Sequence, residues 1–275
     1  MRDLSRAVVI RELLASVDAV RANPLLVFIA AVIDAVFFFA WVFVTTFISD
    51  SLIAHAVLIS NKLSPLLAQK KTGLLKYLFE PDISPLTEKF IVLFALFFIV
   101  SYALYVIFQA ASWWLANSVA GQKQSFRKYF LGFARINLTW FAGYAVFKIL
   151  DILAGLRYVV IKRFAPDAPD LAGSFLLVLF VFLFIAAWLS YPTFKRKTFF
   201  KAPVSVTAPL LFLSLCLFLV GQFIVDNLGN LFLLPNLNKV LYYLVLFVLG
   251  MLLFSVVVFI KIYNSRVIAH VRSQH

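Results

Sequence analysis

The sequence predicts an all-α polytopic membrane protein with six transmembrane helices and an N-terminal interfacial amphipathic helix. Composition is the first reason, because 64% of the 275 residues are hydrophobic and only 13% are charged. A soluble domain has about 45–50% apolar and about 25% charged residues. Six long apolar runs are the second reason, and an alternation of charge between the segments that separate them is the third.

The charge alternation predicts the orientation of the chain. The N-terminal segment, every second loop and the C-terminal tail together hold 15 of the 25 Lys and Arg residues and 3 of the 12 acids. The alternate segments hold 9 basic and 7 acidic residues. Cytoplasmic loops carry such a Lys and Arg excess. We therefore expect a multi-pass protein of the cell membrane with both termini in the cytoplasm. Topology explains the net charge of +13 better than nucleic-acid binding does.

The N-terminal segment, residues 1–23, is expected to form an amphipathic helix. Apolar residues from Val9 to Val20 share one face at about 100° per residue, with Arg11 and Asp18 on the other. Such a helix either lies in the membrane interface plane or packs under the bundle. Asn23 and Pro24 then end it and start the first span.

The six spans form a single membrane domain covering residues 1–275. Each exceeds the roughly 20 residues that cross a hydrocarbon core, and their predicted ranges are 25–48, 87–117, 136–160, 171–192, 206–228 and 237–263. Residues 49–86 are expected to form a long extracytoplasmic loop with one or two short helices resting on the outer surface. A re-entrant loop is the functional alternative.

Two basic cytoplasmic segments are candidates for binding anionic lipid headgroups or an acidic partner. The first is an elbow helix that Ser125 is expected to cap. It places Phe126, Tyr129, Phe130, Phe133 and Ile136 on one face, and its basic residues are Lys123, Arg127, Lys128 and Arg135. The second segment holds Lys195, Arg196, Lys197 and Lys201. Ordinary topology-determining charge is the simpler interpretation of both.

Polar residues inside the spans are a second group of candidates, because ionisable groups in a membrane are costly. These residues are Asp34, Gln109, Lys148, Asp151 and Gln222. Lys148 and Asp151 lie three residues apart and share a helix face, although Lys148 could instead reach Asp34. The set is either a pathway for a proton, an ion or a lipid headgroup, or a neutralised pair that fixes helix packing.

Catalytic and cofactor sites find little support in the sequence. Cys216 is the only cysteine, and the three histidines have no neighbouring nucleophile or carboxylate in sequence. No metal-ligand set and no glycine-rich nucleotide loop is present. We therefore expect no cofactor and disfavour an enzyme, leaving a lipid-modifying activity as a weak alternative.

A family resemblance rests on the stretch from Gly121 to Phe126, on Ala134 with Arg135, and on Asn23 followed by Pro24. These residues resemble the six-span membrane domain found beside some glycerophosphodiester phosphodiesterases and in related uncharacterised membrane proteins. The resemblance implies a membrane module without catalytic residues, because the phosphodiesterase chemistry lies in a separate soluble barrel. The expected function is a non-catalytic module that engages lipids or a partner membrane protein. A small transporter or channel using Asp34, Lys148 and Asp151 is the alternative.

Overall fold

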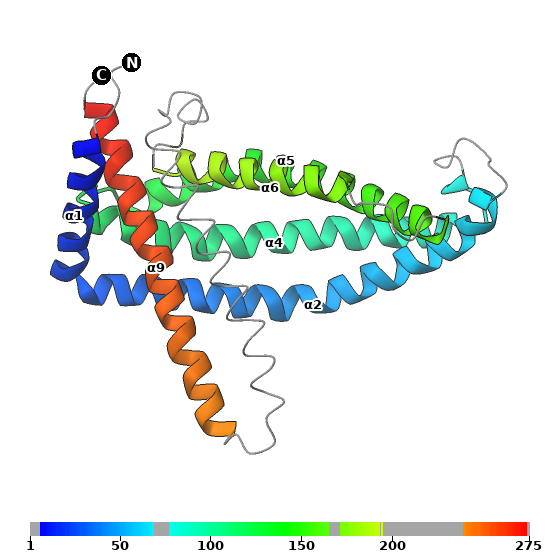
Figure 1. Ribbon diagram of the computed structural model, residues 1–275, viewed down its shortest axis with the longest axis horizontal. Coiled ribbons are helices and arrows are strands. Elements are labelled where there is room, and N and C mark those ends of the chain that lie inside the picture. Colours follow the sequence, from blue (N-terminus) through cyan, green and yellow to red (C-terminus); the bar gives the residue numbers. More distant parts are fainter. Residues whose placement is uncertain (1–5, 69–76, 165–170, 193, 195–238, 274–275) are drawn as a thin grey trace. The chain divides into compact units, whose positions relative to one another are not determined.

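The computed structural model describes residues 6–68, 77–164, 171–192, 194 and 239–273. All regular elements in these ranges are α-helices (Figure 1), and their bounds are α1 Arg6–Ala22, α2 Pro24–Ala68, α4 Ser84–Val119, α5 Phe126–Phe164, α6 Leu171–Ser190 and α9 Lys239–Ser273. All except α1 contain a stretch long and apolar enough to cross a membrane. The all-α polytopic membrane class is therefore confirmed.

Part of the predicted set lies outside the described residues. This applies to the span at 206–228 with Gln222, and to the second basic segment with Lys195, Arg196, Lys197 and Lys201. The other predicted spans each fall within a described helix, apart from the last two residues of the fourth and the first two of the sixth.

The chain forms two compact units. The first comprises Met1–Phe37, Val106–Trp140 and Val181–His275, and the second comprises Phe38–Tyr105 and Phe141–Phe180. In the first unit, the start of α2, the end of α4 and α9 meet in a core in which small alanines let the helix backbones approach closely. Its buried residues are Val27, Ala30, Ala31, Leu115, Ala116, Val119, Val258 and Ile262.

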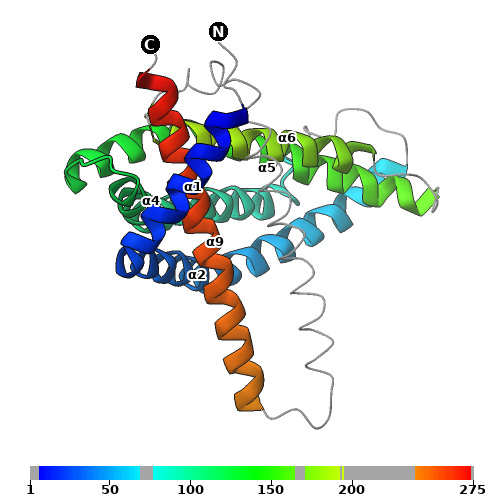
Figure 2. The same ribbon diagram turned by 60° about the vertical axis from the view of Figure 1, so that its left-hand side comes forward.

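The helix predicted at residues 1–23 is present as α1, and it packs against α9 (Figures 1 and 2). Glu12 and Ser16 of α1 are buried, and Glu12 lies 3.4 Å from the Arg266 guanidinium of α9. Ile10 and Leu14 of the apolar face are exposed by 57% and 60%, whereas Val20 of the same face packs against the core. The helix therefore contacts the bundle through both polar and apolar residues, and its position in the interface plane stays a prediction.

The predicted loop at 49–86 is wrong for its first part, because α2 continues to Ala68 and α4 begins at Ser84. No glycine or proline occurs between Pro24 and Pro65, so nothing in the sequence stops the helix at residue 48. The extension also gains contacts within the second unit, since its residues Ile59 and Leu63 pack with Ile83.

The elbow helix and the third predicted span form one continuous helix, α5. They are predicted as a loop segment, 118–135, and a span, 136–160. The backbone has no reason to break between them, since Ala134 and Arg135 are good helix formers and no proline occurs from Phe126 to Phe164. The helix begins at Phe126, immediately after the predicted capping residue Ser125.

Candidate functional site

A buried polar cluster lies in the first unit and joins α2, α4 and α9. The Lys261 ammonium donates to both carboxylate oxygens of Asp34 at 2.7 and 2.8 Å. It also contacts Gln109 Oε1 at 2.9 Å and Ser112 Oγ at 2.7 Å. Gln109 Nε2 in turn donates to Asp34 Oδ1 at 2.9 Å. The side chains of Lys261 and Asp34 are only 1% and 3% exposed, so the two charges contact one another and are buried inside the protein.

The sequence analysis identified Asp34 and Gln109 but missed Lys261, which it counted with the cytoplasmic tail. Lys261 lies inside α9, in the part that can cross a membrane. The sequence could have identified Lys261 as a candidate partner of Asp34, because Lys261 falls within the predicted sixth span and a buried Asp34 needs a counter-ion. The suggestion that Lys148 reaches Asp34 is wrong, since Asp34 pairs with Lys261 instead.

Lys148 and Asp151 form a second ion pair, in the second unit, as their spacing predicted. Lys148 Nζ lies 2.9 Å from Asp151 Oδ2, and both side chains are partly exposed, by 35% and 41%. Lys148 contacts Asp151 and the ring of Phe147 within α5, whereas the buried cluster joins three helices. Exposed pairs of this kind contribute little to stability.

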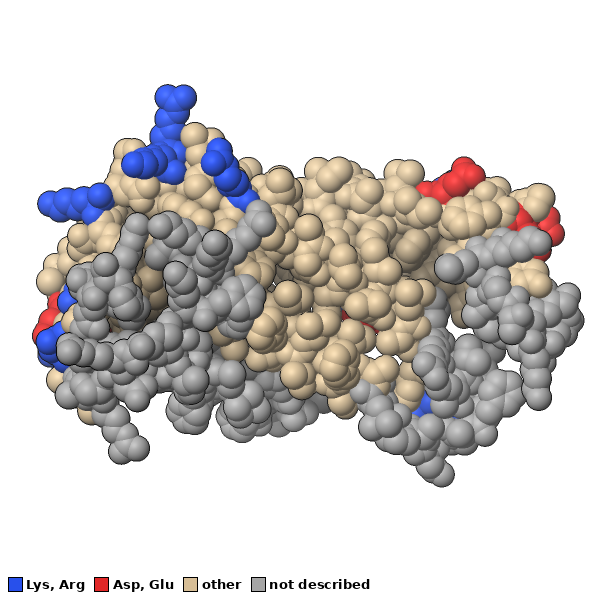
Figure 3. All heavy atoms as spheres, turned by 90° about the horizontal axis from the view of Figure 1, so that it is seen from above, with Lys and Arg blue, Asp and Glu red and all other residues tan. Residues whose placement is uncertain are grey.

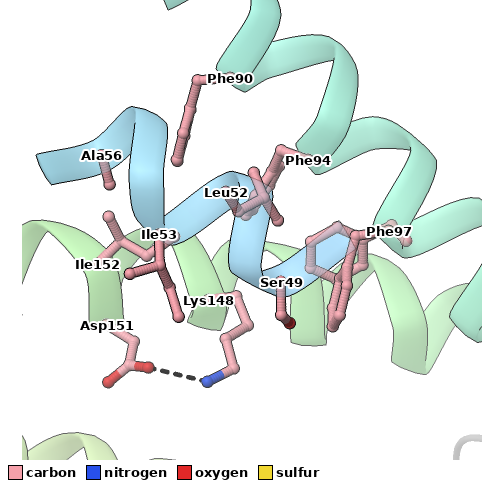
Figure 4. A pocket seen from close by; sticks show the side chains of 11 residues that line it. Ser49, Leu52, Ile53, Ala56, Phe90, Phe94, Phe97, Lys148, Asp151 and Ile152 are labelled. Carbon is pink, nitrogen blue, oxygen red and sulfur yellow. Dashed lines mark hydrogen bonds and ion pairs between the residues drawn. The ribbon is translucent and has the colours of Figure 1, made fainter. Parts of the chain in front are cut away.

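The Lys148–Asp151 pair lies at a cavity of about 250 Å³ between α2, α4 and α5 (Figure 4). Most of the wall is apolar, with Leu52, Ile53 and Ala56 from α2 and phenyl groups from α4. Figure 4 shows the two charged side chains pointing toward one another from α5. The cavity therefore combines an aromatic wall with one positive and one negative group.

A basic surface lies at the start of α5, and we call it the elbow surface. Its residues Lys123, Arg127, Lys128 and Arg135 are all exposed. The opposite face is buried, with Tyr129, Phe133 and Ile136 each at most 5% exposed. Figure 3 shows Lys and Arg side chains as blue spheres, several of which project from the surface.

The turn before the elbow surface is anchored by side-chain hydrogen bonds. Trp114 Nε1 donates to the Gln124 carbonyl at 2.8 Å, and Gln122 Nε2 donates to the Ser265 carbonyl of α9 at 2.8 Å. Both bonds lie within the first unit. The start of α5 is therefore held against α4 and α9 rather than joined to them by the chain alone.

No family model, curated protein or solved structure matches this chain. The resemblance to the membrane domain beside glycerophosphodiester phosphodiesterases therefore stays a prediction. Within the described ranges, no group of three or more His, Cys, Asp or Glu side chains is placed to hold a metal ion.

Proposed function

We propose that this protein is a non-catalytic integral membrane module that engages anionic lipids through the elbow surface. The observation that carries the proposal is the division of one helix into two faces. Arg127, Lys128 and Arg135 are exposed on one side of the start of α5, with Lys123 exposed in the preceding turn, while the other side buries Tyr129, Phe133 and Ile136. Because the buried face is fixed in the bundle, the charges have a fixed place at the membrane surface.

Electrostatics supports anionic lipid as the ligand class. No carboxylate of the described residues lies within 4.0 Å of Lys123, Arg127, Lys128 or Arg135. Each basic residue near an anionic leaflet contributes about 1 kcal/mol of attraction. Four such residues held on one short segment give enough attraction to enrich anionic lipid beside the protein.

We infer an orientation in the cell membrane with both termini and the elbow surface in the cytoplasm. Removing the buried Lys261 from the cytoplasmic count leaves 14 basic residues against 3 acidic ones. The excess therefore remains well above that of the other side, where 9 basic residues face 7 acids.

Transport is the second candidate function, and the cavity at Asp151 is the observation that favours it. The buried cluster argues against a pathway through Asp34, because Asp34 and Lys261 are only 3% and 1% exposed and pair directly at 2.7 and 2.8 Å. A pathway limited to Lys148 and Asp151 would have a largely apolar wall. Lipid engagement therefore fits the observations better than ion passage.

The elbow surface is tested by replacing its four basic residues with glutamine, which keeps most of the side-chain length. The variant K123Q/R127Q/K128Q/R135Q is extracted gently, and its co-purifying lipids are quantified by mass spectrometry. We expect the anionic fraction to fall several-fold, because about 1 kcal/mol per residue is lost.

The matched control is K62Q/K89Q/K162Q, which removes three exposed lysines elsewhere on the chain. It should retain the anionic fraction of the unaltered protein. An equal anionic fraction in the elbow variant and the unaltered protein would disprove the proposal. Loss of a co-purifying protein instead of lipid would assign the surface to a protein partner.

A further inference from the structure

We propose that the cavity between α2, α4 and α5 binds a phospholipid whose zwitterionic headgroup carries a primary amine, with its phosphate at Lys148 and its ammonium at Asp151. The elbow surface has no part in this argument, so the inference goes beyond the proposed function and stands without it.

The depth of the cavity follows from helix lengths. Three candidate membrane spans end within the second unit, at Leu63 in α2, at Ser84 in α4 and at Gly155 in α5. Of the residues that line the cavity, Ala56 lies seven residues before Leu63, Phe90 lies six residues after Ser84, and Lys148 lies seven residues before Gly155.

At 1.5 Å per residue, these separations are about 9–11 Å. The candidate spans are 30–40 residues long, more than the roughly 20 residues that cross a hydrocarbon core. The cavity therefore falls near the ends of the spans, where acyl chains meet headgroups. A ligand there has an apolar part and a polar part at neighbouring depths.

The apolar part of the ligand has a matching wall. Phe90, Phe94, Phe97 and Phe98 line the cavity from α4, with Leu52 and Ile53 from α2. All three walls belong to helices that can cross a membrane, so the molecules outside the cavity are lipids. A volume of about 250 Å³ is smaller than a drug-sized pocket, and it suits the upper part of an acyl chain rather than a whole ligand.

The polar part of the ligand is expected to contact the Lys148–Asp151 pair, in which both groups can form further hydrogen bonds. Lys148 has three N–H donors, one of which contacts Asp151 Oδ2. With 35% and 41% of the side chains exposed, the ammonium and the carboxylate can each take a further partner. An ammonium binds phosphate strongly and a carboxylate accepts from a primary amine. An anionic headgroup lacking an amine would satisfy Lys148 and be repelled by Asp151.

The test compares two lipids on the full-length protein in detergent. Binding of phosphatidylethanolamine and phosphatidylglycerol is measured by native mass spectrometry during titration. We expect about tenfold tighter binding of phosphatidylethanolamine, the size of one charge-assisted hydrogen bond. D151N should abolish this preference by strengthening phosphatidylglycerol binding, whereas K148Q should weaken both lipids. K162Q, an exposed lysine of the same helix, should change neither.

Occupancy of the cavity is tested separately by filling it. A56W places an indole in the cavity, whereas V57W places one at the neighbouring residue, which is 52% exposed and does not line the cavity. We expect A56W to lose bound phosphatidylethanolamine about tenfold and V57W to retain it. Glycerophosphoethanolamine, which has the headgroup without the chains, should not compete.

Three outcomes would overturn the inference. These are equal binding of the two lipids by the unaltered protein, equal binding by A56W and V57W, and competition by the soluble headgroup. D151N gives an answer that does not depend on whether A56W folds, because it leaves the cavity volume nearly unchanged. The elbow variant K123Q/R127Q/K128Q/R135Q should keep the phosphatidylethanolamine preference, so failure of one proposal is distinguishable from failure of the other.

Discussion

At the scale of single residues, burial separates the two ion pairs. Lys261 and Asp34 are almost fully buried, whereas Lys148 and Asp151 are partly exposed. Breaking a buried pair leaves one charge without compensation, and this typically costs about 3–5 kcal/mol. Breaking an exposed pair costs about 0–1 kcal/mol. The same chemistry therefore has different consequences at the two places.

This contrast predicts the stability of four variants. K261M and D34N should each lower the unfolding free energy by about 3–5 kcal/mol, because each leaves one buried charge unpaired. The double variant D34N/K261M should recover much of the loss, since the two residues are directly coupled. Thermal denaturation in detergent, followed by circular dichroism, measures the order of the melting temperatures.

K148M is the control for this series, and we expect it to cost less than about 1 kcal/mol. If K148M and K261M melted at the same temperature, the buried cluster would have no special role in stability. The sequence predicted Asp34 and Gln109 as cluster members, because polar residues within a span need partners. It placed Lys261 within the predicted sixth span, but it could not show that α2 and α9 lie side by side, since Lys261 lies 227 residues further along the chain than Asp34.

At the scale of elements, the turn between α4 and α5 shows how one residue sets a helix end. Gly121 has a φ of +88°. Its N–H donates to the Ser118 carbonyl at 3.1 Å, and the Gln122 N–H donates to the Asn117 carbonyl at 2.8 Å. These two bonds form a Schellman motif, which places glycine at the left-handed position. The elbow surface begins directly after this motif.

We expect G121A to destabilise the protein by about 1–2 kcal/mol, because an L-residue is strained at positive φ. The space around Gly121 is open, so a steric clash cannot explain such a loss. Gly155, inside α5, also has open space but no positive φ. G155A should therefore be neutral or stabilise by about 0.5–1 kcal/mol, and melting temperatures of the two variants test the difference.

Element boundaries also show where sequence patterns stop being informative. The pattern predicted the start of α5 after Ser125, because a serine at that position can cap the first backbone N–H groups of a helix. It placed the end of the first span at residue 48 from hydropathy alone. Hydropathy reports where a helix meets water, whereas the backbone of α2 continues to Ala68 because no breaker precedes Pro65.

At the scale of the whole molecule, composition and charge alternation were sufficient for the all-α membrane class. Both are sums over many residues, so single errors such as the placement of Lys261 changed them little. The inferred orientation makes a prediction about opposite ends of α4. Lys123 follows its C-terminal end and is exposed, while Asp82 precedes its N-terminal end and is also exposed.

Single cysteines at these two positions test the orientation. In a C216S background, which removes the only native cysteine, D82C should react with a membrane-impermeant maleimide in intact cells. K123C should react only after the cells are permeabilised, because it faces the cytoplasm. Labelling of both variants after permeabilisation controls for reactivity. The reverse pattern in intact cells would invert the proposed topology.

The closed ion pair of Asp34 and Lys261 also bears on how this protein responds to a membrane potential. Moving one elementary charge through 100 mV takes about 2.3 kcal/mol, but the paired charges cancel. Their separation of 2.7 Å is about a tenth of the roughly 30 Å hydrocarbon core. Turning the pair fully along the field would therefore change its energy by only about 0.2 kcal/mol per 100 mV. While Asp34 and Lys261 stay paired, a change in membrane potential therefore exerts almost no force on this cluster, and the cluster cannot act as a voltage sensor.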